Sequence, residues 1–183
     1  MSVALAGPRC RLCRLSGTRT HVVAGTGDRE ASLMFIGEAP GRDEDLRGVP
    51  FVGRAGRLLD GALAAAGVSR DDVYITNLVK CRPPGNRRPK GDEVQACRAH
   101  LEAEVRAVGP EVVCLLGQTV ARHLAGSRGR MRDIAGKEIT VKLAGREVQA
   151  FVAYHPAACL YRRENVESLT ETVRLCAEAA GLR

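Results

Sequence analysis

ASLMFIGEAPG, residues 31–41, shows the pattern that decides the fold of this chain. Its first six residues, Ala31–Ile36, form an apolar run that predicts a buried strand, and the Gly and Pro that follow end the strand in a loop. The run Glu111–Leu116 ends in the same way at Gly117, and Asp72–Thr76 is a further short strand. Apolar runs of this length are typical of parallel strands that are covered on both faces.

Segments with apolar residues at helical spacing lie between and after these strands. They predict four helices: Arg54–Ala66, Glu93–Val108, a short one that ends at Ala125, and one from about Glu164 to Ala180. Gly67 is the expected C-cap of the first helix and Asp92 the expected N-cap of the second. Ile139–Leu143 and Val148–Ala153 are expected to form a hairpin. The sequence therefore predicts an α/β fold with helices on both faces of a mainly parallel sheet.

Length and composition limit the class of protein. A chain of 183 residues predicts one domain over 1–183. An apolar fraction of 45% with 27% charged residues excludes both a disordered chain and a membrane-spanning one. The opening apolar segment Val3–Ala6 is too short for the core of a signal peptide, so we expect a cytoplasmic protein that does not contact the membrane.

The positive charge is built almost entirely from arginine. The net charge is +7, and 24 of the 28 basic residues are Arg. Arg binds phosphate oxygens with two parallel donors, so this composition favours a polyanionic partner. The codons of a GC-rich genome favour Arg whatever the function, so composition alone does not decide between these explanations.

Polar and glycine-rich segments directly follow the predicted strands: Gly37–Gly41, Asn77, Gly117-Gln118 and His155-Pro156. In parallel α/β sheets the carboxyl ends of the strands meet at one rim, and ligands bind there. We therefore expect the functional site where these four loops converge.

The seven cysteines favour metal binding or free thiols over disulfides in a reducing compartment. Cys10 and Cys13 have the C-x2-C spacing of a metal site, and Cys81 and Cys97 supply a possible second pair. Zinc sites more often show two short pairs, whereas iron–sulfur sites tolerate scattered cysteines, and spacing alone leaves both open. Of the rest, two fit buried apolar positions and one is ambiguous: Cys114 and Cys176, then Cys159.

A set of motifs, in order along nearly the whole chain, resembles the type-4 (iron–sulfur) uracil-DNA glycosylases. They are Cys10-x2-Cys13, Gly37–Gly41 (GEAPG), Pro50–Gly56 (PFVGRAG), Tyr74–Pro84 (YITNLVKCRPP), Cys97 and His155–Ala157 (HPA). Each motif alone is weak, whereas the set is specific.

The resemblance implies a three-layer α/β/α sandwich around a mainly parallel four-stranded sheet. It implies a 4Fe-4S cluster bound by Cys10, Cys13, Cys81 and Cys97. It also implies a monomeric DNA-repair hydrolase that acts on uracil-containing DNA, single- or double-stranded. The expected reaction cleaves the N-glycosidic bond, releases uracil and leaves an abasic site.

Two departures from related families bear on the function. Relatives that crosslink covalently to uracil-DNA carry an Arg/His-rich insertion after the second-strand motif, and the short loop Pro83–Pro89 here has no His. The better-known uracil glycosylases place an Asp and a Tyr where this chain has Ala39 and Gly41. An ordinary glycosylase is favoured, with a covalently crosslinking relative and a non-catalytic, metal-stabilised nucleic-acid-binding module as alternatives.

Three side chains are the predicted contacts to the base. His155 is expected to donate a hydrogen bond to uracil O2 as negative charge develops there. Asn77 offers one donor and one acceptor, which match O4 and N3–H of uracil but oppose the reversed pattern of cytosine. Phe51, in a Pro/Gly loop, is expected to stack on the flipped base.

The first loop supplies the candidate acids. Glu38 is expected to place the attacking water or to stabilise charge on the sugar, and Glu44 is the second candidate. Gly37 and Ala39 are expected to line the pocket through their backbone.

Two segments are predicted to contact DNA. The first has five positive charges in eleven residues and is expected to bind phosphates: Lys80, Arg82, Arg87, Arg88 and Lys90. The second follows the His155 motif and is a candidate wedge that enters the duplex: Leu160, Tyr161, Arg162 and Arg163.

Overall fold

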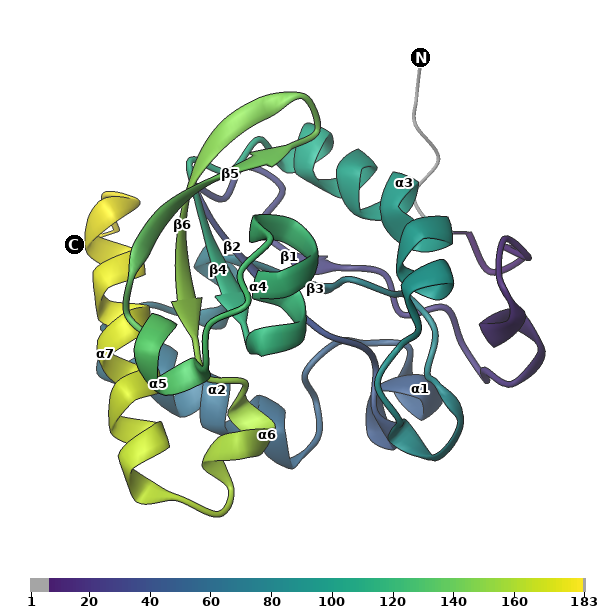
Figure 1. The fold of residues 1–183 in the computed structure, drawn as a ribbon, viewed down its shortest axis with the longest axis horizontal. Helices are drawn as coiled ribbons and strands as arrows, with labels where there is room; N and C mark the ends of the chain where they lie inside the picture. Colours follow the sequence, from purple (N-terminus) through teal and green to yellow (C-terminus); the bar gives the residue numbers. More distant parts are fainter. Residues whose placement is uncertain (1–6, 183) are drawn as a thin grey trace.

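The computed structural model describes residues 7–182 and places six strands in one sheet (Figure 1). Across the sheet they are β1 (Thr26–Gly27), β3 (Tyr74–Asn77), β2 (Leu33–Gly37), β4 (Val112–Leu116), β6 (Arg146–Ala153) and β5 (Glu138–Leu143). The four inner strands are parallel, while β1 and β5 pair antiparallel at the two edges. The mainly parallel sheet is confirmed, but the expected number of four strands is wrong because each edge carries an additional antiparallel strand.

The helices in the described part of the chain are α1 (Arg42–Arg47), α2 (Arg54–Ala65), α3 (Gly91–Val108), α4 (Gln118–Ala125), α5 (Met131–Ile134), α6 (Pro156–Cys159) and α7 (Arg163–Ala179). The four predicted helices are α2, α3, α4 and α7. The other three have only four to six residues, too few for a helical period to be visible in the sequence. The predicted N-cap Asp92 is wrong: α3 starts earlier, with Lys90 as N-cap, because the Glu93 carboxylate accepts the Lys90 amide at 2.7 Å.

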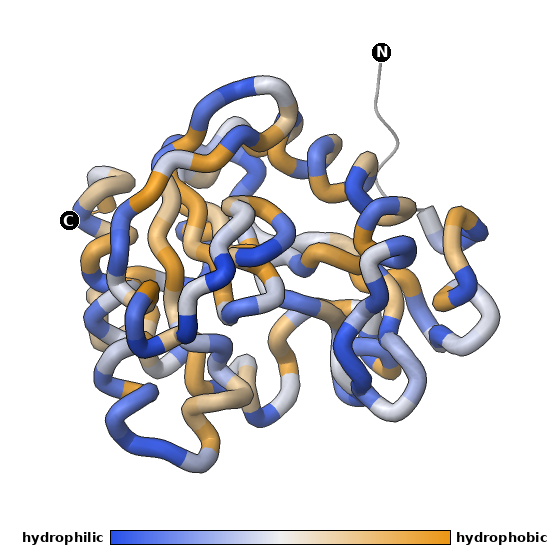
Figure 2. Tube along the Cα trace, viewed as in Figure 1, coloured by the Kyte–Doolittle hydropathy of each residue, from blue (hydrophilic) through white to orange (hydrophobic). Residues whose placement is uncertain are grey.

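Side chains of the inner strands alternate between two apolar cores. Leu33 and Phe35 of β2 pack with residues of α2 and α7, whereas Met34 and Ile36 pack with residues of α3 and α4. Figure 2 shows the apolar inner strands enclosed by helices whose outer positions are hydrophilic. Helices thus cover both faces of the sheet and leave its ends for loops.

The carboxyl ends of the inner strands meet at one rim, as predicted. Gly37 pairs with Asn77, and Leu116 pairs with Ala153, two residues before His155. In Figure 1, α6 lies beyond the end at which the arrow of β6 points, and α1 lies farther to the right in the lower half of the view. The loops expected to carry the function therefore share one edge of the sheet.

None of the helices formed by residues 7–182 combines the length and apolar character that a bilayer crossing requires. The Val3–Ala6 segment, on which the expectation about export rested, lies outside the described residues.

Candidate active site

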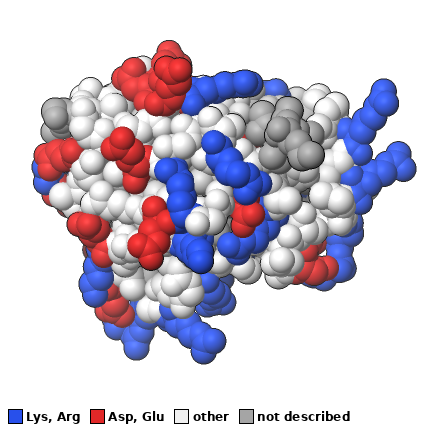
Figure 3. All heavy atoms as spheres, turned by 90° about the horizontal axis from the view of Figure 1, so that it is seen from above, with Lys and Arg blue, Asp and Glu red and all other residues white. Residues whose placement is uncertain are grey.

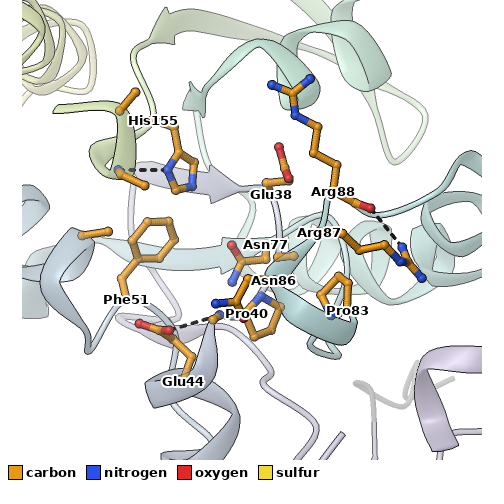
Figure 4. A pocket seen from close by; sticks show the side chains of 15 residues that line it. Glu38, Pro40, Glu44, Phe51, Asn77, Pro83, Asn86, Arg87, Arg88 and His155 are labelled. Atoms are coloured by element: carbon orange, nitrogen blue, oxygen red, sulfur yellow. Dashed lines mark hydrogen bonds between the residues drawn. The ribbon is translucent and has the colours of Figure 1, made fainter. Parts of the chain in front are cut away.

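A cavity of about 450 Å³ opens at this rim, and we call it the rim pocket (Figure 4). Its wall comes from loops that follow β2, β3 and β6 and from the segment before α2. It is lined by Glu38, Ala39, Pro40, Gly41, Glu44, Phe51, Ala55, Asn77, Pro83, Asn86, Arg87, Arg88, His155, Ala157 and Ala158. Eight of the predicted site residues are therefore brought together here.

Asn77 carries an unpaired polar atom at the base of the rim pocket. Its side chain is buried, and Oδ1 is the one buried side-chain polar atom without a hydrogen-bond partner in residues 7–182. Gly37 packs behind it: a Cβ at Gly37 would lie 2.4 Å from Asn77 Oδ1, so a larger residue would displace the carboxamide. A buried acceptor without a partner costs roughly 1–3 kcal/mol, so this oxygen indicates a ligand that carries a donor.

Phe51 lies opposite Asn77 in a strained backbone conformation. Its φ is +53°, an uncommon value for a bulky residue. Its ring is buried and tilted by 33° to the His155 ring, with 5.8 Å between the ring centroids. Figure 4 shows the ring directed into the rim pocket, where it offers an aromatic face to a planar ligand.

Two ionic side chains hold the backbone on either side of Phe51. Arg70 donates to the Pro50 carbonyl at 2.6 Å and to the Phe51 carbonyl at 3.0 Å, and it pairs with Asp60 at 2.7 Å. Glu44 accepts from the amides of Val52 and Gly53 at 2.9 and 2.8 Å. This network stabilises the strained loop. Arg70 was not predicted as a site residue, because it lies 19 residues from Phe51 and outside the motifs.

His155 is the N-cap of α6, and its ring is oriented by the backbone. Nδ1 accepts from the Ala157 amide at 3.1 Å, so the proton of the neutral ring resides on Nε2. Desolvation lowers the pKa of His155 below its ordinary value, while the carboxylates of Glu38 and Glu44 oppose this shift. The ring is thus a neutral donor at pH 7.

The two candidate acids differ in their surroundings. Both Glu44 oxygens are engaged by backbone amides, since Oε2 also accepts from Gly41 at 3.1 Å. No hydrogen bond or ion pair of the Glu38 carboxylate occurs among residues 7–182. In Figure 4 Glu38 lies between His155 and Arg88 at the rim pocket. Glu38 is therefore available to a ligand, whereas Glu44 braces two loops.

The prediction that Lys80 contacts phosphate is wrong. Its side chain is 1% exposed and forms an ion pair with Glu104 at 2.6 Å, so it cannot reach DNA. Residue charge along the chain did not reveal this, because the partner lies 24 positions away in α3.

The other predicted phosphate contacts are at least partly accessible. Arg88 and Lys90 are exposed. Arg82 donates to Asn86 at 2.6 Å, and Arg87 binds both oxygens of Glu93 at 2.7 and 2.8 Å. This arginine is the largest cause of the lowered pKa of Glu93, which falls to about 2.

The candidate wedge lies beside the same rim. Tyr161 is 83% exposed and Leu160 is half-buried, while the exposed Arg162 pairs with Glu164 at 3.4 Å. None of these residues lines the rim pocket itself. Figure 3 views the molecule from above Figure 1, and on this face basic side chains lie across the middle as well as along the right and lower edges.

A second, small cavity is bordered by all four predicted cluster ligands, and we call this site the cysteine cradle: Cys10, Cys13, Cys81 and Cys97. Donors surround the sulfurs: the Lys80 amide lies 3.3 Å from Cys97 Sγ, and Arg19 Nη1 lies 3.5 Å from Cys81 Sγ. No three metal-binding side chains within residues 7–182 are arranged around a single ion. Four converging thiols with sulfur-directed donors nevertheless fit the ligand set of an iron–sulfur cluster, which is larger than one ion.

The remaining cysteines are buried away from the cradle, in β4, α6 and α7: Cys114, Cys159 and Cys176. The first and last occupy apolar core positions, as predicted.

Comparison with known proteins agrees with this geometry. The model of the uracil DNA glycosylase superfamily matches residues 24–177. A type-4 uracil-DNA glycosylase of Archaeoglobus fulgidus is 45% identical over 166 residues, covering 87% of this chain and 83% of that protein. A type-4 uracil-DNA glycosylase of Thermotoga maritima is 40% identical over 86% of this chain and 81% of its own.

A type-5 uracil-DNA glycosylase of Pyrobaculum aerophilum is 36% identical, covering 85% of this chain and 75% of that protein. The family model covers most of the chain, and the type-4 relatives exceed the type-5 relative in identity. The chain therefore belongs to the uracil-DNA glycosylase superfamily and, within it, to the type-4 uracil-DNA glycosylases.

Proposed function

We propose that the rim pocket holds a uracil base that has been turned out of DNA, and that Asn77, Phe51 and His155 bind it there. The protein is a uracil-DNA glycosylase and removes uracil from DNA. The observation that carries the assignment of the pocket is the unpaired, buried Oδ1 of Asn77. Extrusion of the base costs a few kcal/mol, which contacts in the pocket must offset.

Asn77 selects the base in this proposal. Its Oδ1 accepts the N3–H of uracil and its Nδ2 donates to O4, which pairs the orphaned oxygen. Cytosine presents an unprotonated N3 and an amino group instead, so both contacts become repulsive. Gly37 supports this selection because any side chain there would meet the carboxamide and the Phe51 ring.

His155 stabilises the leaving group. As the C1′–N1 bond breaks, its electron pair passes into the uracil ring and negative charge develops at O2. Nε2–H of the neutral His155 donates to this oxygen, a contact that strengthens as the charge grows. Phe51 stacks on the base and keeps it in register with both polar contacts.

Glu38 acts at the sugar. Its carboxylate stabilises the positive charge that develops at C1′ and positions the water whose oxygen bonds to C1′ as uracil departs. The carboxylate accepts the proton that this water loses, and the released uracil anion takes up a proton from solvent. Glu44 acts through the backbone, because its oxygens hold Gly41, Val52 and Gly53 in place. Ala39 contributes only its backbone to the wall.

The cysteine cradle binds a 4Fe-4S cluster with Cys10, Cys13, Cys81 and Cys97 in this proposal. The converging thiols support it. The cluster, when bound, links the N-terminal segment to the loop after β3 and to α3, and it takes no part in base release.

The partner in this proposal is uracil-containing DNA. Basic side chains bind its phosphates, and a wedge of side chains inserts between its bases. The accessible cations are Arg82, Arg87, Arg88, Lys90 and Arg162, and the wedge is Leu160 with Tyr161. We further propose a monomer with one domain over 1–183 that works in the cytoplasm, where its cysteines remain reduced.

Product analysis on an oligonucleotide with one uracil tests the proposed reaction. The expected result is free uracil and an alkali-labile abasic site, with protein and DNA separable under denaturing conditions. A protein–DNA adduct that survives denaturation would instead support the crosslinking alternative. Bound but intact DNA would support the non-catalytic module.

A further inference from the structure

Lys80 and Glu104 form a buried ion pair between the cysteine cradle and the rim pocket. Both side chains are 1% exposed, and Lys80 Nζ lies 2.6 Å from Glu104 Oε2. The ammonium also donates to Thr76 Oγ1 at 2.6 Å and to the Asn77 carbonyl at 2.7 Å. All three of its protons are therefore used inside the protein.

The carboxylate of this pair is equally occupied. Glu104 Oε2 accepts from the Thr76 hydroxyl at 2.6 Å, and Oε1 accepts from the Gly25 amide at 2.8 Å. Buried side chains thus form a hydrogen-bonded network that joins β3, the segment before β1 and α3.

Stability alone does not account for such a pair. Removing two charges from water carries a large desolvation penalty, and well-packed apolar replacements of buried ion pairs are often neutral or stabilising. In some proteins such a pair is retained because it fixes one arrangement of the groups around it.

The group held here is the backbone of Asn77. This residue ends β3, and the amides that follow it still bond to the chain at the end of β2: Leu78 to the Gly37 carbonyl at 2.8 Å and Val79 to the Glu38 carbonyl at 3.4 Å. The Lys80 ammonium donates to the Asn77 carbonyl. It thereby fixes the peptide from which the carboxamide projects into the rim pocket (Figure 4).

The backbone of Lys80 is itself anchored on the other side. Its amide donates to Cys97 Sγ at 3.3 Å, and its carbonyl accepts from Val23 at 2.7 Å. Lys80 therefore connects the cysteine cradle to Asn77 through three residues of chain.

We propose that the Lys80–Glu104 ion pair is the positioning device for Asn77 and so controls how well the enzyme selects uracil. The inference rests on the proposed function of Asn77 as the residue that binds the base edge. Lys80 and Glu104 touch no substrate atom; they act through the orientation of the carboxamide.

The test replaces the pair by neutral residues of similar size, Lys80→Met with Glu104→Gln. The glutamine retains an acceptor for Gly25 and a polar contact for Thr76, while the donor to the Asn77 carbonyl is lost. We expect near-wild-type melting temperature and iron content, at least a tenfold slower single-turnover excision of uracil, and a similar rise in the inhibition constant of free uracil. DNA affinity should change less than threefold.

A double-mutant cycle with Asn77→Ala distinguishes loss of the Asn77 orientation from a general disturbance of the folded structure. In the Asn77→Ala background the pair replacement should cause no further loss of rate. A loss of the same size in both backgrounds, or no loss in the wild-type background, would overturn the inference. The proposed function of Asn77 is judged separately, because it fails only if Asn77→Ala itself excises uracil at the wild-type rate.

Thr76→Val serves where the pair replacement lowers the melting temperature or iron content. It removes only the hydroxyl that hydrogen-bonds to both Lys80 and Glu104, and Thr172→Val in α7 is the matched buried control. Thr76→Val should slow excision several-fold in the wild-type background and have no effect with Asn77→Ala, whereas Thr172→Val should leave the rate unchanged. Equal rates for the two valine variants would contradict the inference.

Discussion

The cysteine cradle and the rim pocket lie on either side of residues 77–81, yet they are built in opposite ways. The cradle gathers thiols from three separate segments around a small cavity, with donors directed at the sulfurs. The rim pocket encloses about 450 Å³ and leaves an acceptor unpaired on its wall. The cradle, with four thiols around a small cavity, suits a permanently bound component, whereas the unpaired acceptor of the rim pocket suits a ligand that comes and goes.

Loss of a cradle ligand should have the largest effect on the molecule as a whole. Cys97→Ala removes one of four thiols from the closed site, so we expect loss of bound iron and a strongly lowered melting temperature. Iron and sulfide analysis of anaerobically purified protein checks this. Cys114→Ala is the control and should retain its iron, because Cys114 lies in β4 away from the cradle. Stoichiometric zinc without iron in the wild-type protein would contradict the cluster assignment.

Substitution of His155 should leave the folded structure intact and strongly slow the excision of uracil. His155→Ala deletes the donor to O2, and removal of such a donor typically slows a reaction by about 10²–10³-fold. Single-turnover excision should fall by about 10²-fold or more, with little change in DNA affinity or iron content. A variant that loses affinity but keeps its rate when saturated would show that His155 serves binding rather than the transition state.

Substitution of Arg70, which holds the backbone of the Phe51 loop, should slow excision less than substitution of a residue that contacts the base. Arg70→Met removes the donors to the Pro50 and Phe51 carbonyls and frees a strained loop. Backbone strain of this kind costs about 1–3 kcal/mol, and a relaxed loop that raises the barrier by about 1.4 kcal/mol would excise uracil roughly tenfold more slowly. Arg70→Lys, which retains a cation near Asp60, should recover part of the rate. Identical rates for Arg70→Met and the wild type would mean that Glu44 alone orders the loop.

The exposed arginines should influence affinity and not chemistry. Arg88→Ala removes a charge that is accessible at the mouth of the rim pocket, so the slope of log affinity against log salt should decrease in magnitude by about one. The saturated excision rate should stay within about twofold of the wild-type rate. Lys137→Ala, at an exposed position before β5, removes the same charge and is the control. An equal change of slope in this variant would indicate that Arg88 acts through the overall positive charge of the protein and not through a phosphate contact.

The residues of the rim pocket were predictable because of where they stand in the chain. Asn77 and His155 follow apolar strands, and parallel strands bring their carboxyl ends together whatever the details of packing. The β5 edge of the sheet was predicted as one strand of the hairpin, and the structure confirms it. The β1 edge was not predictable, since β1 has only two residues and pairs with β3 through the backbone.

The errors at Lys80 and Asp92 share one cause, which is a side-chain contact formed only on folding. The spacing of charges along the chain predicts that Lys80 belongs to an exposed basic loop. In the structure its side chain is buried in an ion pair with Glu104. Glu93 similarly moves the start of α3 by capturing the Lys90 amide. The different tasks of Glu38 and Glu44 were also invisible in the sequence, because they depend on which carboxylate meets the amides of a distant loop.

Base selection by Asn77 is the central claim, and single-turnover excision by Asn77→Asp on matched uracil and cytosine oligonucleotides tests it most directly. The ionised Asp has only acceptors, so it opposes O4 of uracil at a cost of at least roughly 1–3 kcal/mol. Uracil excision should therefore fall by tenfold or more while iron content stays unchanged, with at most slight release of cytosine. Wild-type uracil rates in both Asn77→Asp and Asn77→Ala would contradict the claim and reduce Asn77 to the residue that ends β3.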